Sequence, residues 1–143
     1  MSSAVDVAAR ALARRDRSET DVRRILARKG VSDVEAEEAL ERLRDLGALD
    51  DGRFAAGRAT ALAERGYGDA AIAARLARDG VDRELVDATL SALAPEGDRA
   101  AALTARRGVT LRTARWLAGR GFSADSIESA VAGIADTRAA ELG

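Results

Sequence analysis

One short pattern occurs three times along the chain and limits what the chain can fold into. A glycine is followed by an apolar residue and then by a residue able to cap a helix, at Gly30-Val31-Ser32, Gly80-Val81-Asp82 and Gly121-Phe122-Ser123. Glycine often ends a helix because it tolerates the left-handed conformation, and Ser or Asp oxygens accept hydrogen bonds from the free amides of a helix start. Each copy of the pattern therefore predicts the end of one helix and the start of the next.

Apolar residues stand at fixed distances from these glycines. They lie four positions before each glycine and ten and thirteen positions after it, at Leu26, Leu76 and Leu117, at Leu40, Leu90 and Val131, and at Leu43, Leu93 and Ile134. Spacings of three and four place side chains on one face of a helix. We expect these residues to form the buried faces of two helices in every unit.

A further helix is expected before the pair in each unit. It should cover about residues 5–15 in the first unit, where Ser18 then caps the helix that follows. In the second unit it should run from its cap at Asp50 to Gly66, with Leu49 and Phe54 placed to pack together across the cap. In the third unit it should be shorter, over about residues 99–107, which would explain why the three glycines lie 50 and then 41 residues apart.

The predicted fold class is therefore all-α, with three tandem three-helix repeats that form an elongated, curved array. The expected repeats are residues 1–47, 48–94 and 95–143. The only proline, Pro95, stands beside Glu96 and Gly97. This segment predicts a flexible joint between the second and third repeats.

The chain contains no cysteine and no histidine. It therefore lacks thiol nucleophiles, disulfides, the commonest metal ligands and the usual general base at neutral pH. We expect a protein that is not an enzyme, needs no cofactor or metal, and acts by binding another macromolecule.

Two motifs have a catalytic or ligand-binding interpretation as well as a structural one. The Asp50-Asp51 pair could belong to a metal or acid-base site, but a cap at Asp50 and a favourable first-turn charge at Asp51 explain it better. The segment Gly66-Tyr67-Gly68 could look like a phosphate loop. It lacks a preceding strand and a P-loop lysine, so we interpret it as a turn between helices.

Charge is unevenly distributed although the formal net charge is only −1. Residues 10–29 contain eight basic and three acidic residues, residues 33–51 contain two basic and eight acidic residues, and residues 99–120 contain six arginines and no acid. Some of these cations have structural explanations, because Arg23 can pair with Glu19 and because cations favour helix C-termini. Others are candidates for binding phosphate or an acidic protein.

The candidate binding residues are arginines of the third and first units. They are Arg106, Arg107, Arg112, Arg115 and Arg120 in the third, and Arg14, Arg15, Arg24 and Arg28 in the first. The third-unit block is the better candidate because no acid interrupts it. Trp116 lies within that block and could belong to the core, cover an edge or touch a partner; its neighbour Leu117 favours the core.

No apolar run approaches the roughly 18 residues that a membrane-spanning helix needs. The first 17 residues are rich in Ala and Arg, as transit peptides are, but Asp6 and Asp16 interrupt them and they continue in phase into the first repeat. We therefore expect a cytoplasmic protein with no membrane contact.

Several longer motifs resemble the regulatory protein RecX family, bacterial modulators of the recombinase RecA, over nearly the whole chain. The most specific are Leu49-Asp50-Asp51-Gly52-Arg53-Phe54-Ala55, Arg65-Gly66-Tyr67-Gly68, Arg17-Ser18-Glu19 and Leu26-Ala27-Arg28-Lys29-Gly30-Val31. The third unit matches more loosely, mainly through Arg120-Gly121-Phe122-Ser123. In this resemblance Leu49, Asp50, Asp51, Phe54, Gly66, Tyr67 and Gly68 form the structural motif.

The resemblance implies a monomeric protein of three helical repeats that binds RecA protein and the RecA-DNA filament. It further implies inhibition of filament extension, ATP hydrolysis, strand exchange and co-protease activity, and so a role in homologous recombination, DNA repair and the SOS response. The slightly acidic overall charge departs from the family and indicates weak direct DNA binding. The alternatives are a stand-alone helical DNA-binding protein, a structural adaptor without effect on recombination, and an enzyme.

Overall fold

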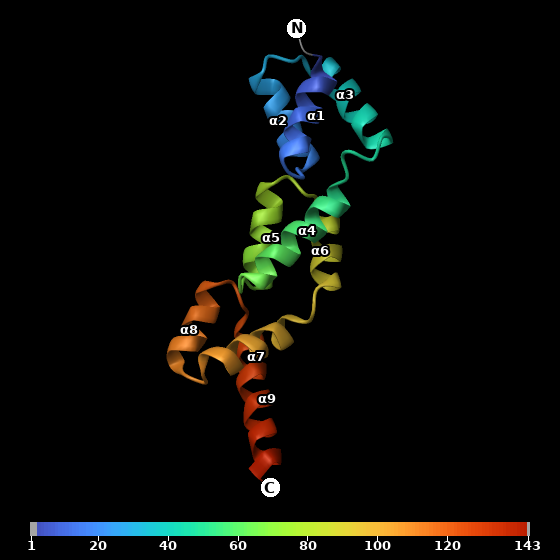
Figure 1. The fold of residues 1–143 in the computed structure, drawn as a ribbon. Helices are drawn as coiled ribbons and strands as arrows, with labels where there is room; N and C mark the ends of the chain where they lie inside the picture. The colour runs from blue at the N-terminus through green and yellow to red at the C-terminus, as the bar shows by residue number, and fades with distance from the viewer. Residues whose placement is uncertain (1–2, 143) are drawn as a thin grey trace.

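The computed structural model describes residues 3–142, without the side chains of residues 134–138. The described residues form helices that follow one another in three groups of three. They are α1 (Ala4–Arg14), α2 (Glu19–Arg28), α3 (Asp33–Asp45), α4 (Asp51–Glu64), α5 (Asp69–Arg78), α6 (Arg83–Ala92), α7 (Glu96–Arg107), α8 (Leu111–Gly119) and α9 (Ala124–Leu142). The groups are arranged along one long axis, and α9 extends from the far end (Figure 1). The predicted all-α fold of three-helix repeats is confirmed.

The predicted caps lie at the predicted helix starts. Side-chain oxygens of Ser18, Ser32, Asp50 and Asp82 accept from the amide three residues later, and Ser123 accepts from Ser126 at 3.1 Å. Gly30, Gly80 and Gly121 have positive φ angles of 80°, 86° and 92°. Capping is chemistry between residues close in sequence, which is why the sequence located these helix ends so closely.

Each repeat has its own hydrophobic core, in which the first helix packs against the third. Leu26, Leu76 and Leu117 are at most 1% exposed, as their spacing from the glycines predicted. Leu40 and Leu43 are buried too, whereas Leu90 and Leu93 are partly buried. Val131 is 39% exposed, so its predicted burial is wrong, and the side chain of Ile134 lies outside the described residues.

The boundary between the first two repeats lies at the start of α4. Leu49 is buried in the first core, with Ala48 packed against the same core, while Phe54 is buried in the second core. The predicted packing of Leu49 on Phe54 across the Asp50 cap is therefore wrong, because each side chain belongs to a different hydrophobic cluster.

The predicted form of the joint between the second and third repeats is wrong. Helix α7 begins at Glu96, three residues earlier than expected, so Glu96 and Gly97 are helical and Pro95 is the residue that precedes the helix. Its 12 residues are fewer than the 14 of α4, so it is shorter than the matching helix of the second repeat, as expected, although by less. The shorter glycine spacing comes also from α6, which has 10 residues where α3 has 13.

Among the helices of residues 3–142, none combines the length and the apolar character that crossing a membrane requires.

Candidate functional site

The first two repeats meet where the turn before α2 lies against the turn between α5 and α6. The Ser18 hydroxyl donates a hydrogen bond to the Asp79 carbonyl at 2.5 Å. At Gly80 an added Cβ would come within 2.2 Å of the Thr20 hydroxyl oxygen. The contact is therefore too close for any residue but glycine at position 80, and it fixes how the two repeats sit together.

The second and third repeats meet in the same way, through Gly66-Tyr67-Gly68. This segment lies between α4 and α5, as the turn interpretation expected. The Gly68 amide donates to the Arg120 carbonyl at 2.8 Å, and the Ala70 amide donates to the Gly121 carbonyl at 3.3 Å. An added Cβ at Gly68 would lie 2.5 Å from the backbone of Gly121 and Phe122. The motif thus serves backbone contact between repeats.

A carboxylate clamps each junction at an equivalent place. Asp51, the first residue of α4, accepts from the Glu19 amide at 2.7 Å. Glu96, the first residue of α7, accepts from the Asp69 amide at 2.6 Å. Glu19 and Asp69 are themselves the first residues of α2 and α5, whose amides have no partner within their own helices. Each repeat therefore supplies a helix-start amide to a carboxylate of the next repeat.

The two clamping carboxylates titrate differently. Burial raises the pKa of Asp51, although the Glu19 amide and its partial positive charge act against this. Burial would also raise the pKa of Glu96, but hydrogen bonds from Ser126, the Asp69 amide and Ser123 outweigh it, so its pKa lies below the ordinary value. Asp50, by contrast, caps its own helix. These structural roles account for the Asp50-Asp51 pair.

Arginines and aromatic rings cover the second junction. The Arg120 guanidinium lies 3.9 Å from the Tyr67 ring centre and 5.1 Å from that of Trp116, and it donates to the Arg65 carbonyl. The Arg107 guanidinium lies 3.8 Å from the Trp116 ring centre. Such cation–π contacts are worth about 0.5–2 kcal/mol each. Two of the candidate binding residues, Arg107 and Arg120, are therefore already engaged within the molecule.

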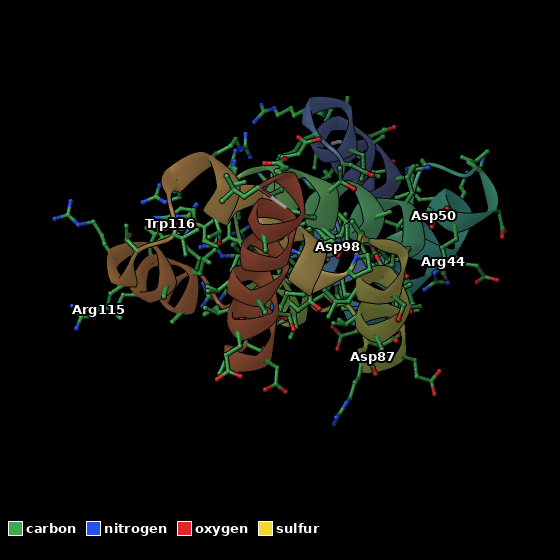
Figure 2. The ribbon with its side chains drawn as sticks, turned by 90° about the horizontal axis from the view of Figure 1, so that it is seen from below. Arg44, Asp50, Asp87, Asp98, Arg115 and Trp116 are labelled. Atoms are coloured by element: carbon green, nitrogen blue, oxygen red, sulfur yellow. The ribbon has the colours of Figure 1, made fainter. Side chains whose placement is uncertain are left out.

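Trp116 lies at the edge of the third core rather than inside it. It is only partly buried, packs against that core, and would approach within 3.0 Å of a Cβ at Gly66 of the second repeat. It therefore covers the junction. Figure 2 shows it directed toward the neighbouring helices, whereas Arg115 extends outward from α8.

Three candidate arginines of the third repeat are exposed and have no acidic partner among the described residues. Arg106 near the end of α7, Arg112 in the first turn of α8 and Arg115 in the middle of α8 are exposed, and we call them the third-repeat patch. Within the part of the chain that the structure describes, none of the three forms an ion pair. Leu111 beside them is 66% exposed.

The first-repeat candidates fall into two groups. Arg24 donates to the Arg78 carbonyl at 3.4 Å, and Arg15 lies 4.0 Å from Asp21. Arg14 and Arg28 instead line a groove of about 460 Å³ between α1 and α2. Sequence reasoning missed three further cations of that groove, namely Arg10, Arg17 and Lys29. The four-residue spacing of Arg10 and Arg14 was the available signal, because it places both on one face of a helix.

Acidic neighbours neutralise other arginines of the first repeat. Arg23 lies 2.6 Å from Glu37 and 3.6 Å from Glu19. Arg44 pairs with Glu19 as well, and its hydrogen bonds hold the pKa of Glu19 below the ordinary value. The expected compensation of Arg23 is therefore present, and it involves α3 as well as α2.

Comparison with known proteins identifies the first two repeats. Residues 4–43 match the first three-helix domain of RecX, and residues 50–90 match the second three-helix domain of RecX. The chain is 37% identical over 137 residues to the regulatory protein RecX of Halorhodospira halophila, covering 89% of this chain and 85% of the relative. It is 38% identical over 131 residues to that of Xanthomonas citri, covering 83% and 80%.

Solved structures share the arrangement of the helices. The crystal structure of RecX from Lactobacillus salivarius superimposes with a TM-score of 0.79 at 18% identity, covering 91% of this chain and 93% of the other. A second crystal structure of regulatory protein RecX gives a TM-score of 0.65 at 22% identity, covering 87% and 71%.

Proposed function

The chain belongs to the RecX family, and from this premise we propose that it is a non-enzymatic regulator of the RecA recombinase in the cytoplasm. It binds RecA or the RecA-DNA filament as a monomer and inhibits filament extension, ATP hydrolysis, strand exchange and co-protease activity. The identity of 37% across 89% of the chain to a protein named regulatory protein RecX carries this proposal.

The fixed repeat junctions support the proposal. A regulator of a filament must match a surface that extends over several subunits. An elongated array whose repeats have a fixed spacing can do so without losing conformational entropy when its repeats become ordered on binding. Close glycine contacts, clamping carboxylates and stacked arginines hold the spacing of the repeats here. Inhibition by occupying a surface requires no catalytic group.

We expect the protein to inhibit the ATPase of RecA on single-stranded DNA when present at or below the RecA concentration. The reason is that a filament binder acts on assembled subunits, so one bound copy affects more than one active site. A titration of this protein into a steady-state ATPase assay measures the effect. An unchanged rate at a large excess of the protein would remove the central proposal.

The alternative is a stand-alone DNA-binding protein, favoured by the basic groove and the third-repeat patch. That protein would bind naked DNA with nanomolar affinity at physiological salt. We expect weak binding instead, because the net charge is −1 and aromatic residues make up only 3% of the chain.

Charge reversal compares the accessible arginines with arginines that already have contacts within the molecule. The variant R112E/R115E should weaken ATPase inhibition with little loss of folding, because both side chains are exposed and unpaired among the described residues. The variant R23E/R24E should weaken inhibition less, since Glu19 and Glu37 already neutralise Arg23 and Arg24 already donates to the Arg78 carbonyl. ATPase titrations of both variants, matched by circular dichroism, give the comparison. A larger defect in R23E/R24E would reverse the ranking.

A further inference from the structure

We propose that the groove between α1 and α2 of the first repeat binds the phosphate backbone of a single-stranded nucleic acid. This inference rests on the proposed function and deepens it, because it names a phosphate contact of the first repeat. It can be tested without RecA, through the salt dependence of binding, even though the affinity for naked DNA is expected to be weak. Cations of α1, of α2 and of the turns that follow these helices line the groove, namely Arg10, Arg14, Arg17, Arg28 and Lys29, and no acidic residue is among its described lining residues.

Three of these cations are available to a ligand. Arg14, Arg28 and Lys29 are exposed, and none forms an ion pair with an acidic side chain among the described residues. Arg17 is held in place, because it donates to the Ala11 carbonyl at 3.1 Å and to Asp21 at 2.9 Å. The groove therefore has one cation in a fixed position, Arg17, and three exposed cations that can move to contact an anion, Arg14, Arg28 and Lys29.

Helix dipoles explain these cations only in part. Arg14 and Arg28 lie in the last turns of α1 and α2, where a cation gains about 0.3–1 kcal/mol at an exposed site. The dipole effect requires a cation near each helix end, but it does not require that the cations of both helices line one groove. Arg10 lies in the middle of α1 and lines the groove as well.

A second groove beside α1 is lined mainly by acidic side chains of α3. This groove between α1 and α3 has a volume of about 510 Å³, and its charged lining residues are Glu35, Glu38, Glu41 and Asp45 with one cation, Arg42. An anionic strand is repelled from that side and attracted to the α1–α2 side. The first repeat is therefore polarised across α1, and this polarity gives an approaching strand one favoured side.

The chemistry of the lining favours phosphate over an acidic peptide. Guanidinium groups match phosphate oxygens with two parallel hydrogen bonds, and phosphodiesters carry one charge on every residue of the strand. The apolar part of the floor is small, formed by Val7, Ala11 and Ile25. An acidic peptide would need a larger apolar surface for its uncharged side chains, so the strand is the better occupant.

The test is fluorescence anisotropy of a labelled oligothymidylate with the full chain at a series of salt concentrations. The variant R14Q/R28Q removes two phosphate contacts, so the slope of log K against log salt should become less steep by about 1.4 for a single strand. The single variant Lys29→Gln should reduce the slope by about half as much. The matched control is R78Q/R83Q, which removes the same charge from exposed arginines outside the groove and should leave the slope nearly unchanged.

Two results would overturn the inference. One is an equal change of slope in R14Q/R28Q and R78Q/R83Q, which would mean that the oligonucleotide responds to net charge alone. The other is displacement of the oligonucleotide by polyglutamate of the same total charge as efficiently as by unlabelled oligothymidylate, which would make the groove a site for acidic peptides. Circular dichroism confirms that each variant is folded before titration.

Discussion

Replacing Gly68 with alanine is expected to separate the second and third repeats while the helices of each remain formed. Gly68 has a φ of −85°, which alanine adopts without strain, so the effect must come from the new methyl group. That Cβ would lie 2.5 Å from the backbone of Gly121 and Phe122. Backbone cannot rotate away as a side chain can, so the two turns must move apart.

Separation of the turns removes several contacts together. The hydrogen bonds from the amides of Gly68 and Ala70 would break, and the Glu96 clamp on the Asp69 amide would stretch. The net contribution of one hydrogen bond to stability is about 1 kcal/mol. The loss of two or three should therefore lower the equilibrium constant for docking of the two repeats roughly 30-fold or more. If inhibition of RecA needs the fixed spacing of the repeats, the inhibitory concentration should rise by at least about tenfold.

The matched control is Gly57→Ala in α4. An added Cβ there meets nothing within 4 Å, and alanine is favoured over glycine inside a helix by about 0.5–1 kcal/mol. This variant should be slightly more stable and fully inhibitory. For Gly68→Ala, far-ultraviolet circular dichroism should be nearly unchanged while Trp116 fluorescence shifts. Unchanged Trp116 fluorescence with full inhibition would show that the junction tolerates the methyl group.

Phe54→Ala is expected to be the most destabilising of the proposed variants, at about 3–5 kcal/mol of unfolding free energy. Phe54 is 7% exposed and lies in the second core with Leu62, Ile72 and Leu76. Alanine would leave a cavity that the surrounding helices cannot fill without distorting the repeat. Urea unfolding of the full chain measures the loss.

An exposed apolar residue provides the control for Phe54. Val34 is 69% exposed in α3, so Val34→Ala should change the unfolding free energy by no more than about 0.5 kcal/mol. The Phe54→Ala variant should still inhibit RecA when it is assayed at a temperature at which it remains folded. A variant that unfolds like the parent protein but has lost inhibition would make Phe54 a contact residue instead of a core residue.

Local chemistry explains which parts of the fold could be predicted. A cap such as Ser32 acts on an amide three residues away, and a leucine such as Leu26 lies on the same helix as the glycine that ends it. Both are therefore visible in a short stretch of sequence. Val131 fails the same reasoning, because its exposure depends on how α9 lies against α7 and not on its distance from Gly121.

The junctions could not be predicted because their partners lie far apart in the chain. Asp51 and Glu96 do the same work with side chains of different length, and the amides that they bind precede them by 32 and 27 residues. Arg120 looked unpaired since no acid is near it in sequence, yet its partner is the ring of Tyr67 from another repeat. Sequence proximity to acids therefore identified Arg112 and Arg115 as accessible but misjudged Arg107 and Arg120.

The carboxylate clamp gives this architecture a way to change its length during evolution. Each junction joins two different surfaces, the start of the second helix in one repeat and the start of the first helix in the next. A contact between unlike surfaces does not close on itself, so it can be propagated. An internal duplication of one repeat would copy both the helix-start amide and the carboxylate. The added repeat could therefore pack against its neighbours through the same contacts. Repeat number is then free to vary under selection for reach along the partner, while the spacing from one repeat to the next stays constant.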